Sequence, residues 1–356
     1  MSITITRAPS YLTIQDFGRT QFREVGVPRC GAMDRAALGT ANAVLGNEAD
    51  AAGLEWALGG GTLRFDHPCV FAVGGASVDV ALNSRPVDVA LKSTPVDVAL
   101  RSTPVDVVLK STPVDVALKS TPVDVAINAT PVEPFTTMHA KAGDVLKISG
   151  FTSGRFLYIA FGGGLDTEEL LGSRSTYRPA HFGGIEGRMI RTGESVRVSA
   201  HNRGRAGFSA PDDLRPDYSR RSIRVVPGPQ WSFFTAEDRA LFFGQSYTVS
   251  RASDRMGYRL EGKPLSASLG LLPSEGVCEG AIQVPPDGLP IVLMADSPTV
   301  GGYPKIGVVA STDLPVLAQL SPGECFQFEE CSVQDAQRRA RRAAGSLHTI
   351  RSLASR

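Results

Sequence analysis

The sequence predicts a mainly β protein, built from sandwiches or barrels with a few short helices. Short apolar or alternating runs recur along the chain and end at Gly or Pro residues, as strands do. Helical patterns are few, and they do not alternate regularly with the strands. This arrangement favours β-sandwiches or barrels over a doubly wound α/β sheet.

The predicted strands are short. The first, residues 2–7, alternates Ile with Thr. Further along, the apolar runs 282–284 and 291–294 flank a Pro-Pro-Asp-Gly sequence that suits a tight turn. The full set comprises residues 2–7, 62–65, 69–73, 144–148, 156–161, 195–199, 222–226, 246–251, 282–284, 291–294 and 324–328.

A few segments have helical patterns. Residues 34–45 place Ala and Leu at helical spacing after Asp34, a favourable N-cap residue. Residues 236–243 follow Thr235, which can cap a helix in the same way. Residues 333–353 are rich in Ala and Arg and predict a basic terminal helix.

A chain of 356 residues is long enough for roughly two domains. Residues 201–220 are rich in Arg, Asp, Pro, Gly and Ser, which predicts a linker. We therefore expect an N-terminal half at 1–200, a C-terminal half at 221–330 and a basic helical tail at 331–356.

Composition argues against several classes of protein. The balance of 42% hydrophobic and 21% charged residues is that of a soluble globular chain, and the formal net charge of +1 gives no reason to expect nucleic acid or a membrane as partner. No run approaches the ~18 apolar residues of a transmembrane helix, and the start lacks the apolar region of a signal peptide. The five cysteines are widely spaced without a CxxC motif, which predicts free thiols, no metal site and a cytoplasmic location.

Residues 86–130 contain five copies of a nine-residue unit that begins as PVDVALKST. Each unit combines one alternating strand with one turn, and residues 77–85 resemble a parent copy. Removing 86–130 joins Arg85 to Pro131 in the same reading frame. We interpret the insert as a tandem expansion of one hairpin, with a dedicated binding element as the alternative.

The most informative stretch is residues 276–304, where a predicted buried strand leads into a polar loop with paired glycines. Such loops commonly build a site on a rigid scaffold. A plain β-hairpin with a glycine-rich loop is the alternative. The polar end of this stretch carries Asp296, Ser297, Thr299, Gly301, Gly302 and Tyr303.

Further stretches could also carry chemistry. Residues 15–34 lead, with glycines, into a helix N-terminus that suits an anion, or they form a long connection. Residues 253–262 interleave Asp254 and Arg255 with apolar residues. This pattern indicates either a surface ion network or a site that binds a substrate carboxylate. Residues 174–188 hold a loop histidine, which is more often structural than catalytic.

Several nucleotide and cofactor motifs are absent from the sequence. It has no GxxxxGK[ST] loop, no GxSxG elbow and no Met-Lys-Met of the kind that carries biotin. If ATP or biotin takes part in the function, we expect a partner chain to hold much of the machinery.

Taken together, these stretches resemble the biotin-dependent carboxyltransferase family, also called the allophanate hydrolase subunit 2 or Kip-antagonist family. The resemblance is closest in kind to those members that are the C subunit of 5-oxoprolinase, and it extends from about Ser2 to Glu329 except for the repeats. It rests on QDFGR…GVPRCGAMDRAALGTANAVLGN…LE, VPGPQ, SDRMGYRLEG and GAIQVPPDGLPIVLMADSPTVGGYPKIG. Departures are Cys30 in place of the usual Ser, Pro298 in place of Gln, and Val300 in place of the second Thr of a pair.

The resemblance implies two cyclophilin-like β-barrel subdomains. It also implies a subunit of an ATP-dependent 5-oxoprolinase, which opens 5-oxo-L-proline to L-glutamate. The implied partners are a subunit-1 (Kip-inhibitor-like) protein and a LamB/YcsF-type subunit. The alternatives are a biotin-dependent carboxyltransferase that uses biotin on a separate carrier, and a non-enzymatic Kip antagonist that binds a Kip-inhibitor-like partner.

Opening a lactam requires groups that hold the amide edge, stabilise oxyanion charge and place a base. We assign the amide edge to Gln283, the base or polar anchor to Asp296, and the oxyanion donors to the backbone of Gly301 and Gly302. Tyr303 and Arg255 are expected to orient the substrate. The predicted catalytic residues are Asp296, Gln283 and Tyr303, and the predicted substrate-binding residues are Arg255, Thr299, Gly301, Gly302 and Asp254.

Overall fold

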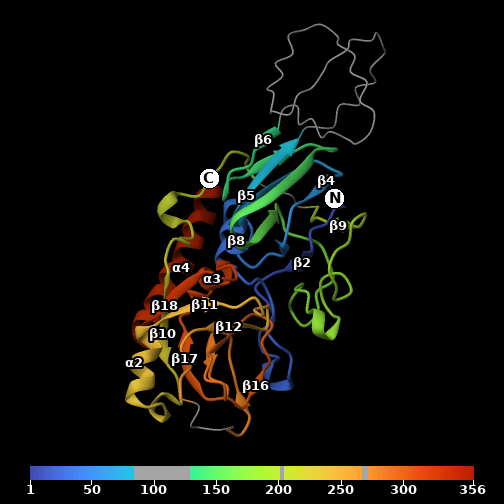
Figure 1. Cartoon of the computed structure of the whole chain (residues 1–356). Helices are drawn as coiled ribbons and strands as arrows, with labels where there is room; N and C mark the ends of the chain where they lie inside the picture. The colour runs from blue at the N-terminus through green and yellow to red at the C-terminus, as the bar shows by residue number, and fades with distance from the viewer. Residues whose placement is uncertain (84–128, 201–203, 267–271) are drawn as a thin grey trace, which may run out of the picture.

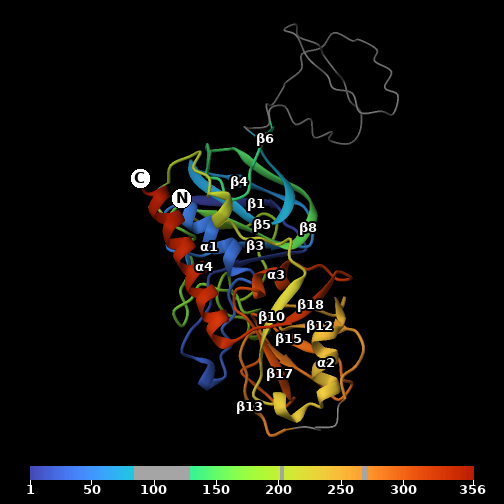
Figure 2. The ribbon, with the colours of Figure 1, turned by 90° about the vertical axis from the view of Figure 1, so that its left-hand side faces the viewer.

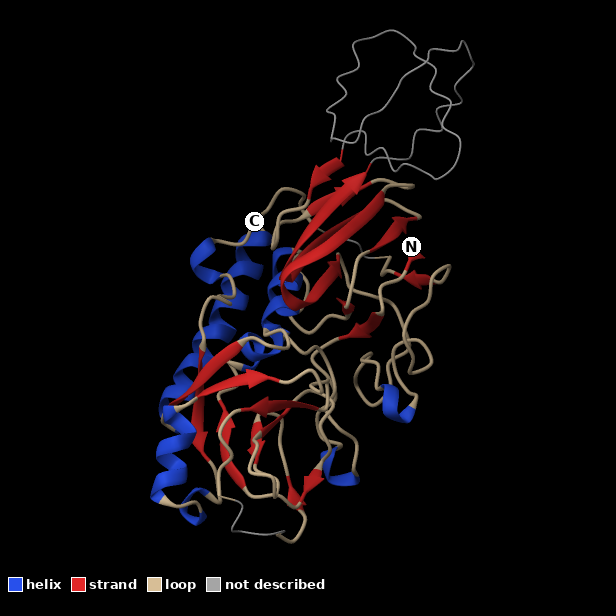
Figure 3. Ribbon diagram, in the orientation of Figure 1, coloured by secondary structure: helices blue, strands red, loops and turns tan. Residues whose placement is uncertain are grey.

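The computed structural model describes residues 1–83, 129–200, 204–266 and 272–356. Strands dominate the described chain, and the few helices lie mainly along one side of it (Figure 3). The mainly β prediction is therefore confirmed. Most of the repeat insert, including the predicted hairpin units, lies outside the described residues.

The first half forms one curled, open sheet (Figure 1). Its main strand order is β2-β3-β8-β4-β1-β9, and β5 pairs with β6, β7 and β8. The implied first barrel is thus a half-barrel rather than a closed one. Its strands are β1 (Ser2–Arg7), β2 (Tyr11–Gln15), β3 (Gly53–Ala57), β4 (Gly61–Phe65), β5 (Cys69–Asn83), β6 (Ala129–Pro131), β7 (Met138–Ala140), β8 (Val145–Phe161) and β9 (Ser195–Arg197).

Two long antiparallel strands, β5 and β8, dominate this sheet. The sequence predicts three short strands in their place, at 69–73, 144–148 and 156–161. The pairing of β5 with β8 continues beyond the predicted ends, from Phe71 to Asn83. Register shifts between Gly75 and Val80 let the two strands stay paired across this length. The inner face buries a separate apolar core that includes Ile3, Leu12, Trp56, Phe65, Phe71 and Ile159.

The second half is a closed seven-stranded barrel with the order β10-β17-β14-β15-β12-β11-β18. Closure leaves no free edge in this sheet. Its strands are β10 (Ser222–Pro227), β11 (Ser246–Val249), β12 (Gly257–Glu261), β14 (Ala281–Gln283), β15 (Ile291–Leu293), β17 (Lys305–Val309) and β18 (Cys325–Glu330). A separate pair joins β13 (Glu275–Gly276) to β16 (Val300–Gly301).

The helices begin where local capping predicts. Helix α1 (Arg35–Val44) follows Asp34, whose carboxylate accepts a hydrogen bond of 2.8 Å from the Ala37 amide. Helix α2 (Ala236–Gly244) begins with a capping box between Thr235 and Asp238. Both N-cap predictions are confirmed. The short 3-10 helices are η1 (Arg23–Val25), η2 (Arg178–Ala180), η3 (Asp212–Leu214) and η4 (Trp231–Phe233).

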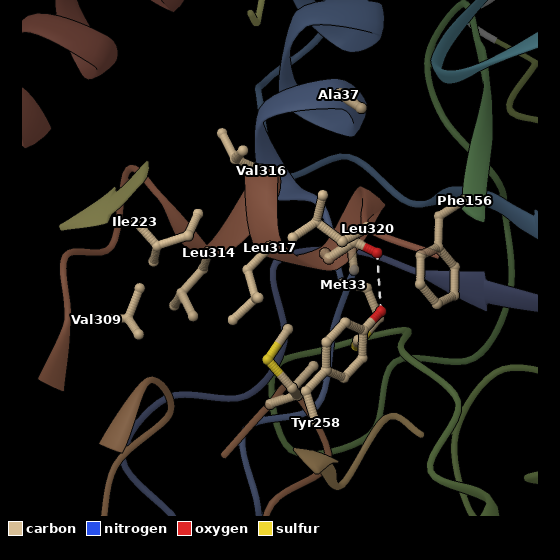
Figure 4. Packing of buried hydrophobic residues seen from close by; sticks show 14 of the residues in the cluster. Met33, Ala37, Phe156, Ile223, Tyr258, Val309, Leu314, Val316, Leu317 and Leu320 are labelled. Atoms are coloured by element: carbon tan, nitrogen blue, oxygen red, sulfur yellow. Dashed lines mark hydrogen bonds between the residues drawn. The ribbon is translucent and has the colours of Figure 1, made fainter. Parts of the chain in front are cut away.

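Helix α3 (Leu314–Gln319) lies where the two halves meet (Figure 4). Leu314 and Leu317 belong to one apolar cluster that includes Ala37 and Phe156 of the first half and Ile223 of the barrel. Burial of apolar surface on both sides therefore holds the halves against each other.

The C-terminal helix α4 (Val333–Ala354) leaves the barrel and packs along α1 of the first half (Figure 2). Ile350 is fully buried in this contact, and the Arg351 guanidinium forms an ion pair with Glu48. The predicted basic helix is thus present, and it spans both halves of the molecule. Of the helices in the described part of the chain, none is long and apolar enough to cross a membrane.

The insert begins and ends on neighbouring strands. Asn83 at the end of β5 pairs with Ala129 at the start of β6, and Ala81 pairs with Pro131. Ala129 and Thr130 are the last two residues of the insert, so β5 pairs both with the end of the insert and with Pro131, the residue that follows it.

Candidate functional site

Long-range contacts bring the four highlighted stretches together between the two halves. From the 15–34 stretch, the Cys30 amide donates a hydrogen bond of 3.0 Å to the carbonyl of Ala295. Arg23 of the same stretch donates to the carbonyls of Val277 and Pro298, at 2.5 and 3.2 Å. The polar loop after β15 is therefore held against a loop of the other half.

The 174–188 stretch is attached through Asp16. The Asp16 carboxylate accepts hydrogen bonds from the hydroxyls of Ser173 and Ser175, at 2.6 and 2.5 Å, and from the Arg174 amide at 2.6 Å. It also accepts one from the Gly18 amide at 2.7 Å. A carboxylate with this many donors positions its loop and has little capacity left for a ligand.

A buried ion cluster of Arg255, Asp296 and Glu55 lies at the centre of this region. The Arg255 guanidinium donates to both Asp296 oxygens, at 2.9 and 2.8 Å, and to Glu55 Oε1 at 2.5 Å. It also donates to the carbonyl of Gly31 at 2.6 Å. Burial alone lowers the pKa of Arg255, but Asp296 and Glu55 more than reverse this and raise it well above its usual range.

A hydrogen-bond chain extends this cluster to helix α1. The Tyr158 hydroxyl donates to Glu55 at 2.7 Å and accepts from the Asp34 amide at 2.8 Å. The Asp34 carboxylate accepts from the Tyr218 hydroxyl at 2.6 Å and from the Gln319 amide at 2.8 Å. Burial raises the pKa of Asp34 to about 6, although the hydrogen bonds from Tyr218 and Gln319 oppose the shift.

A pocket of about 800 Å³ lies beside the ion cluster, lined by residues of both halves. Three of the predicted site residues line it, namely Asp254, Arg255 and Asp296. The other side chains of the lining come mainly from the 174–188 stretch and the residues after it. We call this space the inter-half pocket.

The remaining predicted residues belong to a second group around Gln283, outside that lining. Gln283 is 6% exposed, and its Nε2 finds no acceptor among the described residues. A side chain at Gly301 would overlap this amide nitrogen, so the glycine leaves it room. A buried, unpaired donor is costly unless a ligand completes it.

Buried Lys305 lies beside Gln283, because β14 and β17 place the two residues opposite each other. Its ammonium forms an ion pair with Glu275, which also accepts a hydrogen bond of 2.8 Å from Gln230. The Lys305 amide donates to the Gln230 side chain at 3.1 Å. We call Gln283, Gly301, Lys305, Glu275 and Gln230 the Gln283 group.

Thr299, Gly302 and Tyr303, the remaining predicted residues, lie next to β16 and β17 and are placed by backbone hydrogen bonds. The carbonyl of Thr299 accepts from Val277 at 3.0 Å, and that of Gly302 accepts from Leu272 at 2.9 Å. The carbonyl of Tyr303 accepts from the Lys305 ammonium at 3.5 Å. The predicted site residues thus form two groups, one beside the inter-half pocket and one around Gln283.

Sequence reasoning missed Glu55, Lys305 and Glu275. A signal existed for Lys305, since a lysine inside an apolar strand (YPKIGVV) requires a partner when it is buried. Glu55 gave the same signal within GLEWA of β3. In the described part of the chain no set of three or more His, Cys, Asp or Glu side chains could hold a metal ion.

Comparison with known proteins identifies one family. The family described as "Carboxyltransferase domain, subdomain A and B" matches residues 25–99 and 100–330. The C subunit of the 5-oxoprolinase of Haemophilus influenzae is 31% identical over 98% of this chain and 97% of its own length. The Escherichia coli protein of the same name is 31% identical over 94% of this chain and 93% of its own length.

A solved structure matches the fold over nearly the whole chain. The urea amidolyase of Kluyveromyces lactis superposes with a TM-score of 0.79 at 26% identity, and the match covers 98% of this chain. This chain spans only 20% of the length of that larger protein.

Proposed function

This chain belongs to the carboxyltransferase-domain family with subdomains A and B, and we propose that it is a subunit of an ATP-dependent 5-oxoprolinase. That enzyme opens 5-oxo-L-proline to L-glutamate. The observation that carries the proposal is the match to the C subunits of two 5-oxoprolinases, which covers nearly the full length of this chain and of each relative. The urea amidolyase relatives, in contrast, contain this unit as less than a quarter of a longer chain.

The Gln283 group is the proposed place for the lactam. The Nε2 of Gln283 can donate to the lactam carbonyl without breaking an existing hydrogen bond, because it has no acceptor among the described residues. Gly302, which follows the paired Gly301 of β16, supplies the proposed backbone oxyanion donor, and Thr299 and Tyr303 are proposed to orient the ring. Lys305 lies opposite Gln283 on β17, and its ammonium is paired with Glu275.

The geometry favours Asp296 as a polar anchor rather than as the base. Both of its oxygens accept hydrogen bonds from Arg255, and a carboxylate in a two-point ion pair is a weak proton acceptor. We assign Arg255 an indirect role. Its hydrogen bonds to Asp296 fix the start of the loop that carries Thr299 to Tyr303. Asp254 caps the turn before β12 by accepting from two backbone amides.

ATP, when bound in the complex, supplies the phosphoryl group that makes a lactam carbonyl reactive towards water. The Gln283 group does not fit a triphosphate, because its only cation, Lys305, is already paired with Glu275. We therefore assign ATP to the assembled complex. The proposed partners are a subunit-1 (Kip-inhibitor-like) protein and a LamB/YcsF-type subunit.

Reconstitution tests this proposal. The chain is mixed with its two companion subunits, 5-oxo-L-proline and ATP, and released glutamate is measured with and without the chain. We expect ATP-dependent glutamate only when all three subunits are present. Absence of turnover in the complete mixture contradicts the proposal.

The similarity to the urea enzymes supports a second candidate, carboxyl transfer from a biotin carrier to an amide or urea. A parallel reaction with urea and a carboxylated biotin carrier separates the two functions. In the same assays, an Asp296→Asn chain that assembles and retains full turnover would remove Asp296 from the chemistry.

A further inference from the structure

The inter-half pocket carries positive charge that the protein does not neutralise. Arg155 and Arg178 line it from the first half, and no carboxylate among the described residues pairs with either. Aromatic rings hold both side chains instead. The guanidinium carbon of Arg155 lies 5.1 Å from the ring centre of Tyr258, and that of Arg178 lies 5.9 Å from the ring centre of Tyr11.

The other charged groups of the lining are already satisfied within the protein. Arg255 is paired with Asp296 as described above. Arg188 pairs with two glutamates, at 3.0 and 2.8 Å, and Asp254 accepts two backbone hydrogen bonds. Arg191 is an exposed residue of the lining, and its charge helps to lower the pKa of Glu194. Arg155 and Arg178 therefore account for the uncompensated charge.

The guanidinium of Arg155 is also incompletely bonded. Its Nη1 is buried without a hydrogen-bond partner among the described residues, and its Nη2 donates a long hydrogen bond of 3.5 Å to the Ser253 carbonyl. Leaving such a charged donor unpaired in a protein is costly. The contact with the Tyr258 ring restricts the guanidinium, so less entropy is lost when an acceptor binds.

We propose that the inter-half pocket binds a small organic oxyanion, a molecule whose carboxylate or phosphate group lies between Arg155 and Arg178. A planar guanidinium offers two parallel N–H groups that match the oxygens of such groups. The apolar side chains of Phe156, Met189 and Met256 in the same lining suit the body of the molecule. Residues of both halves form the site, so a bound anion also stabilises their arrangement.

Titration calorimetry on the purified full-length chain tests this inference without the companion subunits. The probes are inorganic phosphate, 5-oxo-L-proline and ATP, and 2-pyrrolidinone serves as a lactam without a carboxylate. Arg155→Gln and Arg178→Gln remove one cation each. Arg197→Gln is the matched control, because Arg197 is an exposed arginine of the same half, outside the pocket lining.

We expect at least one oxyanion probe to bind the chain. Each pocket variant should weaken that binding about tenfold or more, and the control should leave it unchanged. Any binding of 2-pyrrolidinone, a lactam suited to the Gln283 group, should be the same in the pocket variants as in the unmodified chain. Arg178 is exposed, so its variant tests the site even if Arg155→Gln fails to fold. If 5-oxo-L-proline is the one probe whose binding depends on the two arginines, the group that they hold is a carboxylate. If the binding of phosphate or ATP depends on them, the group is a phosphate.

The inference is overturned if no oxyanion probe binds the unmodified chain, or if both pocket variants bind as the control does. Because the assay measures binding to the isolated chain, its result is independent of whether the complex opens 5-oxo-L-proline.

Discussion

The Arg255 cluster, which joins the two halves, and the Gln283 group of the second half both contain buried polar side chains, but they differ in how completely those side chains are bonded. Every nitrogen of the Arg255 guanidinium donates to an acceptor, with partners from both halves. In the Gln283 group one amide nitrogen has no acceptor among the described residues. Polar side chains whose hydrogen bonds are all made within the protein stabilise its structure. A polar group with an unpaired donor is suited to bind a ligand that accepts the missing hydrogen bond.

Replacing Arg255 is the strongest way to break this comparison. Arg255→Ala leaves Asp296 and Glu55 as two buried carboxylates without their cation, which should lower the free energy of unfolding by about 3–5 kcal/mol. Denaturant unfolding followed by circular dichroism measures the change. The control is Arg338→Ala, which removes an exposed pair on α4 and should cost no more than about 1 kcal/mol. Equal effects of the two variants would contradict the structural role of Arg255.

Replacing Gln283 should show the opposite profile. Gln283→Leu removes an unpaired donor, so we expect stability to stay within about 1 kcal/mol of the unmodified chain. Turnover of the reconstituted complex should fall by about 10²–10³ if this amide binds the reacting carbonyl. Glutamate release and denaturant unfolding are measured on the same preparation. Full activity in a stable variant would exclude Gln283 from the site.

The series of hydrogen bonds that runs from Glu55 through Tyr158 to Asp34 offers a third case. Asp34, the last carboxylate of the series, accepts hydrogen bonds from Tyr218 and Gln319 and has no cation beside it among the described residues. Its pKa in the folded protein, about 6, lies above the ordinary value of 3.8. The neutral carboxyl therefore favours folding, and this contribution is fully present below pH 3.8 and is lost as the pH rises through 6.

Asp34→Asn removes this titration. The difference in unfolding free energy between the unmodified chain and the variant should change by on the order of 2 kcal/mol between pH 3.8 and pH 6, in favour of the variant as the pH rises. Denaturant unfolding at several pH values measures it. A difference that does not depend on pH would show that Asp34 titrates normally.

Deleting residues 86–130 should have the smallest effect. Neither polar group uses a residue of the insert. The deletion removes Ala129 and Thr130 of β6, but it keeps the pair between Ala81 and Pro131 and the pairing of β5 with β8 through Asn83. We expect unfolding free energy to change by no more than about 1–2 kcal/mol, since loop length affects stability only slowly. Size-exclusion chromatography with the companion subunit measures complex formation. Loss of solubility or of the complex would show that the repeats are an essential layer.

The helix starts and the strand registers show where sequence reasoning succeeds. The sequence predicts α1 and α2 to within about one residue, because Asp34 and Thr235 cap them through contacts three residues away. It does not predict the length of β5 and β8, because each continues only as far as its partner does. The open first sheet is missed for the same reason, since strand order is a property of distant pairings.

The candidate site divides in the same way. Motif order alone selected Gln283, Asp296, Arg255 and the glycines as residues of one site. Their division into two groups was not predictable, because Arg255 is separated from Glu55 by 200 positions in the chain.

The sequence by itself therefore determined the β class, the local caps, the repeat and the family. Only the tertiary structure decided that Asp296 is engaged by Arg255. It also decided that, among the described residues, the Gln283 amide nitrogen has no acceptor and no carboxylate pairs with Arg155. The physical reason is that caps, turns and periodicity depend on neighbours in the chain. Whether a polar group is satisfied depends on which distant side chains the packed halves bring to it.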